Sequence, residues 1–186
     1  MSSAETEASD EIVVVEYDPG WAALFAELRS AVWPAVMDIA LSIEHVGSTS
    51  VPGLAAKPVI DMDVMVPSAQ IATGIARLAE LGYVHRGDLG VPQREAFARP
   101  EGTPAHHLYL CPVGSPALAN HLAVRDYLRE NAAAARSYGS LKQRLAQTFA
   151  RDRVGYTQAK THFLLAVLRE VGFSDERLAE IERSNR

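Results

Sequence analysis

Apolar residues along the chain recur with two periods, one typical of strands and one typical of helices. Short runs that are rich in β-branched residues or alternate with polar ones predict strands at 12–16, 43–46, 59–66, 83–86, 95–99 and 106–111. Helical spacing over 21–36 predicts a first helix, which Asp18 and Pro19 open and Pro34 kinks or breaks. A second helix is expected at 71–81, closed by the glycine that follows it.

From Ser115 onward the pattern is helical throughout. One helix begins at Ser115, a second is capped by Asn131, a third covers 158–171 and a short last one is capped by Ser174. The chain has no internal repeat and no linker long enough to separate domains. The sequence therefore predicts an α+β fold, with a mixed β-sheet, packed helices and a helical C-terminal half.

Composition indicates an ordinary folded protein. A chain of 186 residues with 48% hydrophobic and 22% charged residues is typical of one globular domain, which we expect to cover 12–186. The acidic stretch 1–11 has no apolar core, so it is interpreted as a disordered lead-in and not as a signal peptide. The net charge of −5 argues against a strongly basic nucleic-acid surface.

Two features favour a cytoplasmic protein without a membrane partner. No window approaches the ~18 apolar residues that a membrane span needs. The single cysteine, Cys111, has no partner within the chain for a disulfide, which fits a reducing compartment. Cys111 lies in an apolar run, so we interpret it as a buried small side chain.

Asp61 and Asp63 are the candidate catalytic residues. They stand two apart in an otherwise apolar strand, and alternation places both side chains on one face of the sheet. Two neighbouring carboxylates repel each other, and a divalent cation such as Mg²⁺ relieves that repulsion while it binds phosphate oxygens. The competing interpretation is a solvated strand face, and the pair alone does not decide between the two.

The loop before this strand favours the cation. Gly47 follows a strand and lets backbone N–H groups approach a phosphate closely, while Ser48 and Thr49 add hydroxyl donors. Lys57 adds a positive charge. Gly-Ser alone is a weak signal, but Gly-Ser followed by an Asp-x-Asp strand is far more specific.

At these residues the sequence resembles the DNA polymerase β-like nucleotidyltransferase superfamily and, within it, the GrpB-like family. The segment His45-Val46-Gly47-Ser48-Thr49-Ser50-Val51-Pro52-Gly53-Leu54 carries the resemblance, together with Lys57-Pro58 and Ile60-Asp61. Further matching segments are Gly90–Glu95, His106–Tyr109, Asn120–Leu122, Arg125–Leu128 and Tyr156–Lys160. The resemblance implies a nucleotidyltransferase-like fold.

The chain departs from the superfamily pattern at one position. Such enzymes usually add a third carboxylate from a later strand, whereas 106–111 carries no acid and offers His107. We expect His107 to share the metal with Asp61 and Asp63. An imidazole suits Zn²⁺, Mn²⁺ or Fe²⁺ better than Mg²⁺, so both the two-metal mechanism and the identity of the metal stay open. Mg²⁺ and Mn²⁺ are the first candidates.

Arg94 and Lys160 complete the predicted phosphate-binding set. Arg94 is interpreted either as a bidentate phosphate clamp or as a surface arginine paired with an acid. Lys160 is a candidate phosphate or carboxylate partner. His121 and Arg125 lie four apart on a predicted helix, and either contact with the sheet or solvation explains them.

Three functions compete on this basis. The first is a metal-dependent transfer of a nucleotidyl group from a nucleoside triphosphate to an acceptor that the sequence does not identify. The second is a non-catalytic module that binds a nucleotide or another phospholigand. The third is a metal-dependent hydrolase that uses Asp61, Asp63 and His107.

Overall fold

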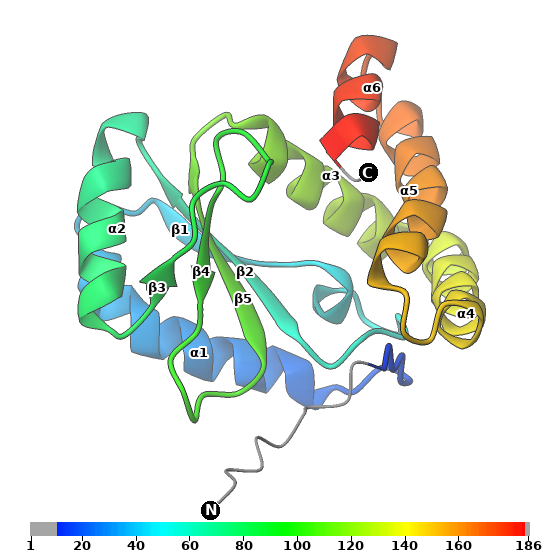
Figure 1. Ribbon diagram of the computed structural model, residues 1–186, viewed down its shortest axis with the longest axis horizontal. Helices are drawn as coiled ribbons and strands as arrows, with labels where there is room; N and C mark the ends of the chain where they lie inside the picture. The colour runs from blue at the N-terminus through cyan, green and yellow to red at the C-terminus, as the bar shows by residue number, and fades with distance from the viewer. Residues whose placement is uncertain (1–10, 185–186) are drawn as a thin grey trace, which may run out of the picture.

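A mixed five-stranded sheet forms the centre of the computed structural model, which describes residues 11–184 (Figure 1). Its strands, in the order in which they lie side by side, are β1 (Ser42–Val46), β2 (Ile60–Val66), β5 (His106–Pro112), β4 (Glu95–Ala98) and β3 (Val84–His85). Only β2 and β5 pair in parallel; the other neighbours are antiparallel. The parallel pair therefore lies inside the sheet, and helices cover it as they cover buried parallel strands in general.

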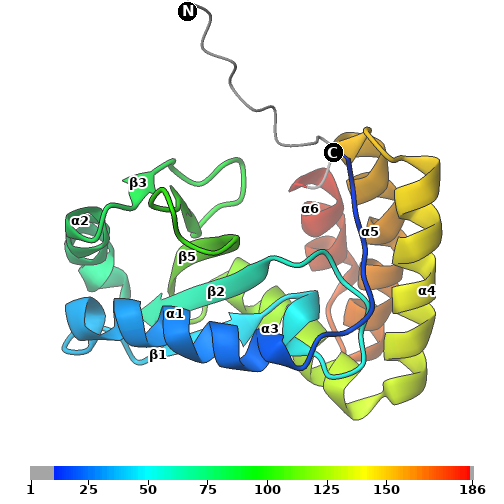
Figure 2. The same cartoon turned by 90° about the horizontal axis from the view of Figure 1, so that it is seen from below.

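Six α-helices and two short 3₁₀ turns surround the sheet in the described part of the chain. The helices are α1 (Gly20–Val36), α2 (Ile71–Glu80), α3 (Pro116–Glu130), α4 (Ala132–Thr148), α5 (Arg153–Glu170) and α6 (Asp175–Ser184), and the 3₁₀ turns are η1 (Ser48–Ser50) and η2 (Ser68–Gln70). Helix α1 runs along β2, while α4, α5 and α6 stand together at one end of the sheet (Figure 2). Helix α3 contacts β1 and β5 and so joins this helical half to the sheet.

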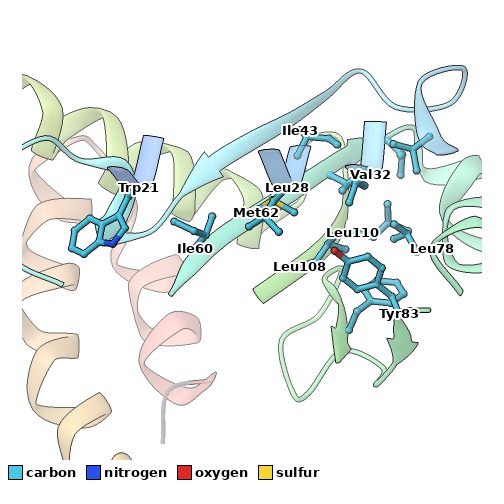
Figure 3. Close-up of a cluster of buried hydrophobic side chains, with 14 of the residues drawn as sticks. Trp21, Leu28, Val32, Ile43, Ile60, Met62, Leu78, Tyr83, Leu108 and Leu110 are labelled. Carbon is cyan, nitrogen blue, oxygen red and sulfur yellow. The ribbon is translucent and has the colours of Figure 1, made fainter. Parts of the chain in front are cut away.

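The main core lies between the sheet and helices α1 and α2 (Figure 3). Ile60 and Met62 point from β2 into this core, where they meet Leu28 of α1. Helix α2 comes unusually close to β5 at Gly74, because a Cβ there would lie 2.8 Å from a methyl group of Leu110. Each large side chain buried here contributes about 1.5–3 kcal/mol relative to leaving it exposed. The alternate residues of β2 face the opposite side of the sheet.

The predicted α+β fold, with its mixed sheet and helical C-terminal half, is confirmed. The capping residues predicted from the sequence mark the starts of α1, α3 and α6 correctly. Asp18 accepts a hydrogen bond from Gly20 N at 2.8 Å, and Ser115 and Ser174 cap α3 and α6 through their hydroxyl groups. Asn131 precedes α4, but its side chain donates instead to the Tyr127 carbonyl at the end of α3.

Three sequence expectations about elements are wrong. The segment 12–16 does not form the predicted strand and makes a single β-bridge, between Val15 and Ala56. The reason is that Ile12 packs against the helical half, where its N–H donates to Ala150 O at 2.7 Å. Helix α1 continues through Pro34, so the predicted break is wrong, while the alternative of a kink stays a prediction. Helix α5 begins earlier than predicted because Asp152 accepts a hydrogen bond from Gly155 N at 2.8 Å and caps it there.

Two further expectations concern the N-terminal stretch 1–11 and the absence of a membrane-spanning helix. Most of the lead-in predicted for 1–11 lies outside the described residues. Within 11–184, none of the helices combines the length and the apolar character that crossing a bilayer requires.

Candidate functional site

Asp61 and Asp63 lie on the face of β2 that points away from α1. In the parallel register with β5, Asp61 stands beside His107 and Asp63 beside Tyr109. His107 Nδ1 donates to Asp61 Oδ1 at 2.8 Å, and His121 Nδ1, on α3, donates to Asp63 Oδ2 at 2.7 Å. Strand alternation thus brings the two carboxylates to one side of the sheet, each hydrogen-bonded to an imidazole.

Asp63 is the more deeply buried of the pair. Its side chain is 0% exposed, and within residues 11–184 its Oδ1 has no hydrogen-bond partner. Burial of the His121 ring lowers the pKa of His121, but the charge and the hydrogen bond of Asp63 outweigh burial and raise that pKa overall. The raised pKa favours the protonated form of His121 beside Asp63, and one carboxylate oxygen remains for another partner.

Gly47 is held directly against the Asp61 carboxylate. Its φ of +69° and ψ of −173° fall in a region that is essentially restricted to glycine. A Cβ at this position would overlap Asp61 Oδ2 and would lie 2.9 Å from Cγ. Ser50 Oγ donates to Gly47 O at 2.6 Å and braces the turn, and Ser48 lines the adjoining cavity. The Gly-Ser motif therefore lies directly against the Asp61 carboxylate, and its predicted phosphate contact stays a prediction.

His45 fixes the base of this loop. The His45 ring stacks on Phe25 of α1, with centroids 4.5 Å apart. Thr49 Oγ1 donates to Val59 O at 3.3 Å, so the hydrogen bond between His45 Nε2 and Thr49 Oγ1, 3.0 Å long, has the imidazole as donor. Burial lowers the pKa of His45 to about 4 and keeps the ring neutral at physiological pH. The Thr49 hydroxyl thus has an internal acceptor, and its predicted phosphate contact stays a prediction.

A cavity of about 880 Å³ opens between the aspartate face of the sheet and the helical half. This volume falls in the range of ligand pockets, about 300–1,000 Å³. Its apolar wall on α3 and α5 includes Val124, Leu128, Leu164 and Leu168. Its polar lining includes Gly47, Ser48, Asp61, Arg94, Tyr109, Asn120, His121, Arg125, Lys160, Arg177, Glu180 and Arg183. The lining therefore combines two carboxylates, Asp61 and Glu180, with a larger number of basic side chains.

Arg94 projects from the loop before β4 into this cavity. Its guanidinium carbon lies 4.4 Å from the centroid of the Tyr109 ring, and its Nε has no partner within 11–184. Burial, reinforced by the charge of Asp61, raises the pKa of Tyr109 to about 12, so the ring stays neutral beneath the guanidinium. Arg94 is thus available to an anion in the cavity and is not paired with an acid in this arrangement.

The lysines gather on the helical side of the site. Lys160 lines the cavity, and the Nζ atoms of Lys57 and Lys160 lie 4.6 and 5.4 Å from the centroid of the Tyr156 ring. Burial lowers the pKa of both, and the charge of Lys160 lowers that of Lys57 further. The two lysines predicted from the sequence therefore lie close together, at the Tyr156 ring.

Sequence reasoning missed Lys142, and it left the role of His121 undecided. Lys142 lies on α4 and is only 3% exposed. In the sequence it looks like any lysine on an amphipathic helix, so nothing there indicated that it is buried. For His121 the signal was its place four residues before Arg125. The contact with the sheet is the correct alternative, since Arg125 also donates to Glu44 Oε2 at 2.7 Å on β1.

The arrangement can hold a cation that arrives with a phosphate ligand. Asp63 Oδ1 is an unpaired buried acceptor, and Asp61 lines the cavity beside it. One or two carboxylates together with phosphate oxygens are the usual ligands of Mg²⁺. Within 11–184 no three or more His, Cys, Asp or Glu side chains are grouped as a preformed metal centre. His107 is 58% exposed and bound to Asp61, and its place in a metal site stays a prediction.

The family model of the GrpB protein matches residues 11–170. The chain belongs to the GrpB family. Among its relatives is the UPF0157 protein YqkA of Bacillus subtilis, 31% identical over 155 residues, which are 83% of this chain and 45% of YqkA. The chain thus spans less than half the length of that relative.

Solved structures extend the comparison to the fold. The crystal structure of GrpB from Enterococcus faecalis superposes with a TM-score of 0.74 at 33% identity, covering 86% of this chain and 99% of that one. The Cid1 poly(U) polymerase in its MgGTP-bound form gives a TM-score of 0.51 at 17% identity, over 83% of this chain and 51% of that one. The GrpB chain therefore has a nucleotidyltransferase-like fold, as the sequence resemblance implied.

Proposed function

We propose that this GrpB-family chain is a metal-dependent nucleotidyltransferase that transfers a nucleotidyl group from a nucleoside triphosphate to an acceptor. The observation that carries the proposal is the contact between Gly47 and the Asp61 carboxylate at the edge of a ligand-sized cavity. In this proposal the turn at Gly47 and Ser48 binds phosphates beside Asp61 and Asp63, which lie on one strand face, and this arrangement suits nucleotidyl transfer.

Each group of residues has a distinct part in this proposal. Asp61 and Asp63 would hold a divalent cation, Mg²⁺ or Mn²⁺, whose positive charge would offset the negative charge that develops on the phosphates during transfer. The backbone of Gly47 and the hydroxyl of Ser48 orient the phosphates in the ground state. His121 donates a 2.7 Å hydrogen bond to Asp63 and holds that carboxylate in place.

Basic side chains neutralise the remaining charge of the triphosphate. Arg94 and Lys160 line the cavity, and Lys57 lies next to Lys160 across the Tyr156 ring. A triphosphate carries about four negative charges, more than one divalent cation balances, so these side chains are required for tight binding. The preferred base and the acceptor are left open. A cytoplasmic location is part of the proposal, supported by the free, buried thiol of Cys111.

One observation favours a second function, a module that binds nucleotide without transferring it. The β5 positions beside Asp61 and Asp63 carry His107 and Tyr109, where the superfamily pattern expects a third acid. Tyr109 stays a neutral phenol, since burial raises its pKa to about 12. A site without a third carboxylate keeps the phosphate contacts and loses a ligand for a second metal.

A ligand screen followed by product analysis separates these functions. Thermal shifts are measured with each nucleoside triphosphate, with and without Mg²⁺, Mn²⁺ or Zn²⁺. A ligand that binds only the folded state stabilises it by about 2.7 kcal/mol at a hundredfold excess over the dissociation constant. Transfer releases pyrophosphate and leaves a covalently modified acceptor, hydrolysis leaves free nucleotide products, and a binding module leaves the triphosphate intact. If no triphosphate shifts the melting temperature with any metal, the proposal fails.

A further inference from the structure

Helix α6, which stands beside α5 (Figure 1), turns a polar face toward the cavity. Its cavity-lining residues are Arg177, Glu180, Ile181, Arg183 and Ser184. Positions 177, 180, 181 and 184 are three or four apart, so they share one face of the helix. Packing alone favours apolar side chains at such a face, as on the α3 and α5 walls of the same cavity. The charged residues of α6 therefore indicate contact with a polar ligand.

Arg177 is held in place on this face and lacks an acceptor for one of its donors. Its guanidinium carbon lies 4.2 Å from the centroid of the Phe173 ring, and its Nη2 donates to Pro116 O, in the first turn of α3, at 3.5 Å. Within residues 11–184 its Nε is buried and makes no hydrogen bond. A buried donor without a partner costs free energy, and an anion that accepts from it offsets this cost. Arg177 is thus positioned to bind an anionic group.

Asn120 provides a second unused polar atom, one helical turn after Pro116 on α3. Asn120 lines the cavity, and within the described chain its Oδ1 is buried and has no hydrogen-bond partner. An amide oxygen only accepts, so it suits an O–H or N–H group of a ligand. A molecule that carries both an acidic group and a hydroxyl or amine complements Arg177 and Asn120 together.

The contacts along α3 show where Arg177 lies relative to the aspartates. The contact with Arg177 is in the first turn of α3, the contact with Asp63 is in its middle, and the contact with Ser50, in the turn after Gly47, is in its last turn. At a rise of about 1.5 Å per residue, the first and last of these contacts lie roughly 20 Å apart along the helix. Arg177 and the Gly47 turn are therefore on opposite sides of the aspartates along α3.

We propose that the α6 end of the cavity binds the acceptor of nucleotidyl transfer, and that this acceptor is a small molecule whose acidic group, a carboxylate or a phosphate, is held by Arg177. The inference rests on the proposed function, because it takes the triphosphate to lie at Gly47 and Asp61. The acceptor's hydroxyl or amine forms a bond to the α-phosphorus while the bond from that phosphorus to the bridging oxygen breaks. Pyrophosphate leaves with the electron pair, and the proton of the attacking group passes to water.

The charges of α6 favour a small acceptor over a polynucleotide. Glu180 lines the cavity together with Arg177 and Arg183, so the helix offers one acid among its two arginines. Such a mixture suits a single acidic group, whereas the phosphate backbone of a nucleic acid needs a continuous basic surface. The matched family model ends at residue 170, before α6, so the family match gives this helix no role.

Anion binding at Arg177 is measured with inorganic phosphate and succinate as probes. The ¹⁵N signal of the Arg177 Nε–H group is identified as the one that Arg177→Lys lacks. We expect each anion to shift this signal saturably, both in the free protein and when the α,β-methylene analogue of a triphosphate saturates the site with Mg²⁺. A signal that neither anion moves, or that the triphosphate analogue itself moves and then protects from both anions, overturns the inference. If the anions bind but no triphosphate does, the proposed function fails and the acceptor assignment fails with it.

Transfer assays test the acceptor itself. The small-molecule fraction of a cell extract is divided on an anion exchanger, and each part is incubated with an α-phosphate-labelled triphosphate. We expect acceptor activity in the retained part, and phosphatase treatment, with the phosphatase removed before the assay, abolishes it for a phosphate and spares it for a carboxylate. Arg177→Gln should lower labelling at limiting acceptor about tenfold to a hundredfold, the loss typical of a removed charged hydrogen bond. Excess acceptor should restore labelling.

Two further variants separate binding of the acceptor from packing of α6. Arg177→Lys keeps the charge and should retain part of the labelling. Arg169→Gln removes an arginine that is 65% exposed, contacts Asp175 at the start of α6 and does not line the cavity, so it should label like wild type. Stabilisation by triphosphate should be the same in all four proteins. Acceptor activity in the unretained part, full labelling by Arg177→Gln, or an equal loss of triphosphate stabilisation in that variant overturns the inference while the proposed function stands.

Discussion

A side chain at position 47 would occupy the space that the Asp61 carboxylate takes. Gly47→Ala should therefore displace Asp61, in addition to about 1–3 kcal/mol of backbone strain at its φ of +69°. We expect the variant to lose nucleotide-dependent stabilisation in a thermal-shift assay. Gly53→Ala is the matched control, because Gly53 also has a positive φ, +77°, while a Cβ there meets nothing within 4 Å. Equal ligand responses in the two variants would show that Asp61 does not need its present position.

Arg94 is a second residue whose role one substitution decides. Its Nε has no partner within 11–184 although it lines the cavity, so Arg94→Ala removes a phosphate contact without leaving an acid unpaired. Triphosphate affinity should fall about tenfold or more, as for other charged hydrogen bonds, with urea unfolding nearly unchanged. Arg86→Ala, at an exposed arginine of the same segment, controls for the loss of charge. Unchanged affinity for every triphosphate would make Arg94 a structural residue.

At the scale of elements, His45 ties β1 to α1 and to the loop that ends at η1. It stacks on Phe25 and donates to Thr49, and burial holds its pKa at about 4 against 6.5 for a free histidine. Between pH 6.5 and 4 the unfolded chain binds a proton at His45 that the folded chain does not. Stability should consequently fall as the pH drops through this window, by up to about 3 kcal/mol from this residue.

Urea unfolding at a series of pH values measures this contribution. The slope of the unfolding free energy against pH between 4 and 6.5 should be smaller for His45→Asn than for wild type. The comparison of slopes removes the contributions of other histidines, which both proteins share. Parallel slopes would mean that His45 is protonated in the folded protein and does not fix the loop as a neutral donor.

Elements follow from the sequence where local pattern and tertiary environment agree. The alternation in β2 and the caps at Ser115 and Ser174 are local, so they were predictable. The segment 12–16 has strand-forming residues, yet Ile12 finds its partners beside Ala150 in the helical half, and this contact decides its conformation. At this segment tertiary packing outweighs the intrinsic strand propensity of the residues, as is usual for short segments.

At the scale of the whole molecule, the aspartate face was predictable and its surroundings were not. Asp61, Asp63, Gly47 and Ser48 lie within one short stretch of sequence, where spacing and strand period fix their relation. The pairing of Asp63 with His121 spans 58 positions and depends on how α3 crosses the sheet. The surroundings of Lys142 on α4 include Lys160 of α5 and Asp61 of β2, which are far apart in the sequence. A net charge of −5 likewise conceals a cavity lined by arginines and a lysine.

The central claim, that the aspartate face catalyses transfer, is tested most directly by label transfer from an α-phosphate-labelled triphosphate to cell-extract acceptors with Mg²⁺ or Mn²⁺. Wild type and Asp61→Asn are compared, with a thermal shift on the same samples. We predict that wild type labels an acceptor, whereas Asp61→Asn loses labelling by at least about a hundredfold and keeps most of its triphosphate stabilisation, since the cation acts chiefly on charge that develops during reaction. Wild type that is stabilised by triphosphate yet labels nothing with either metal would contradict the claim.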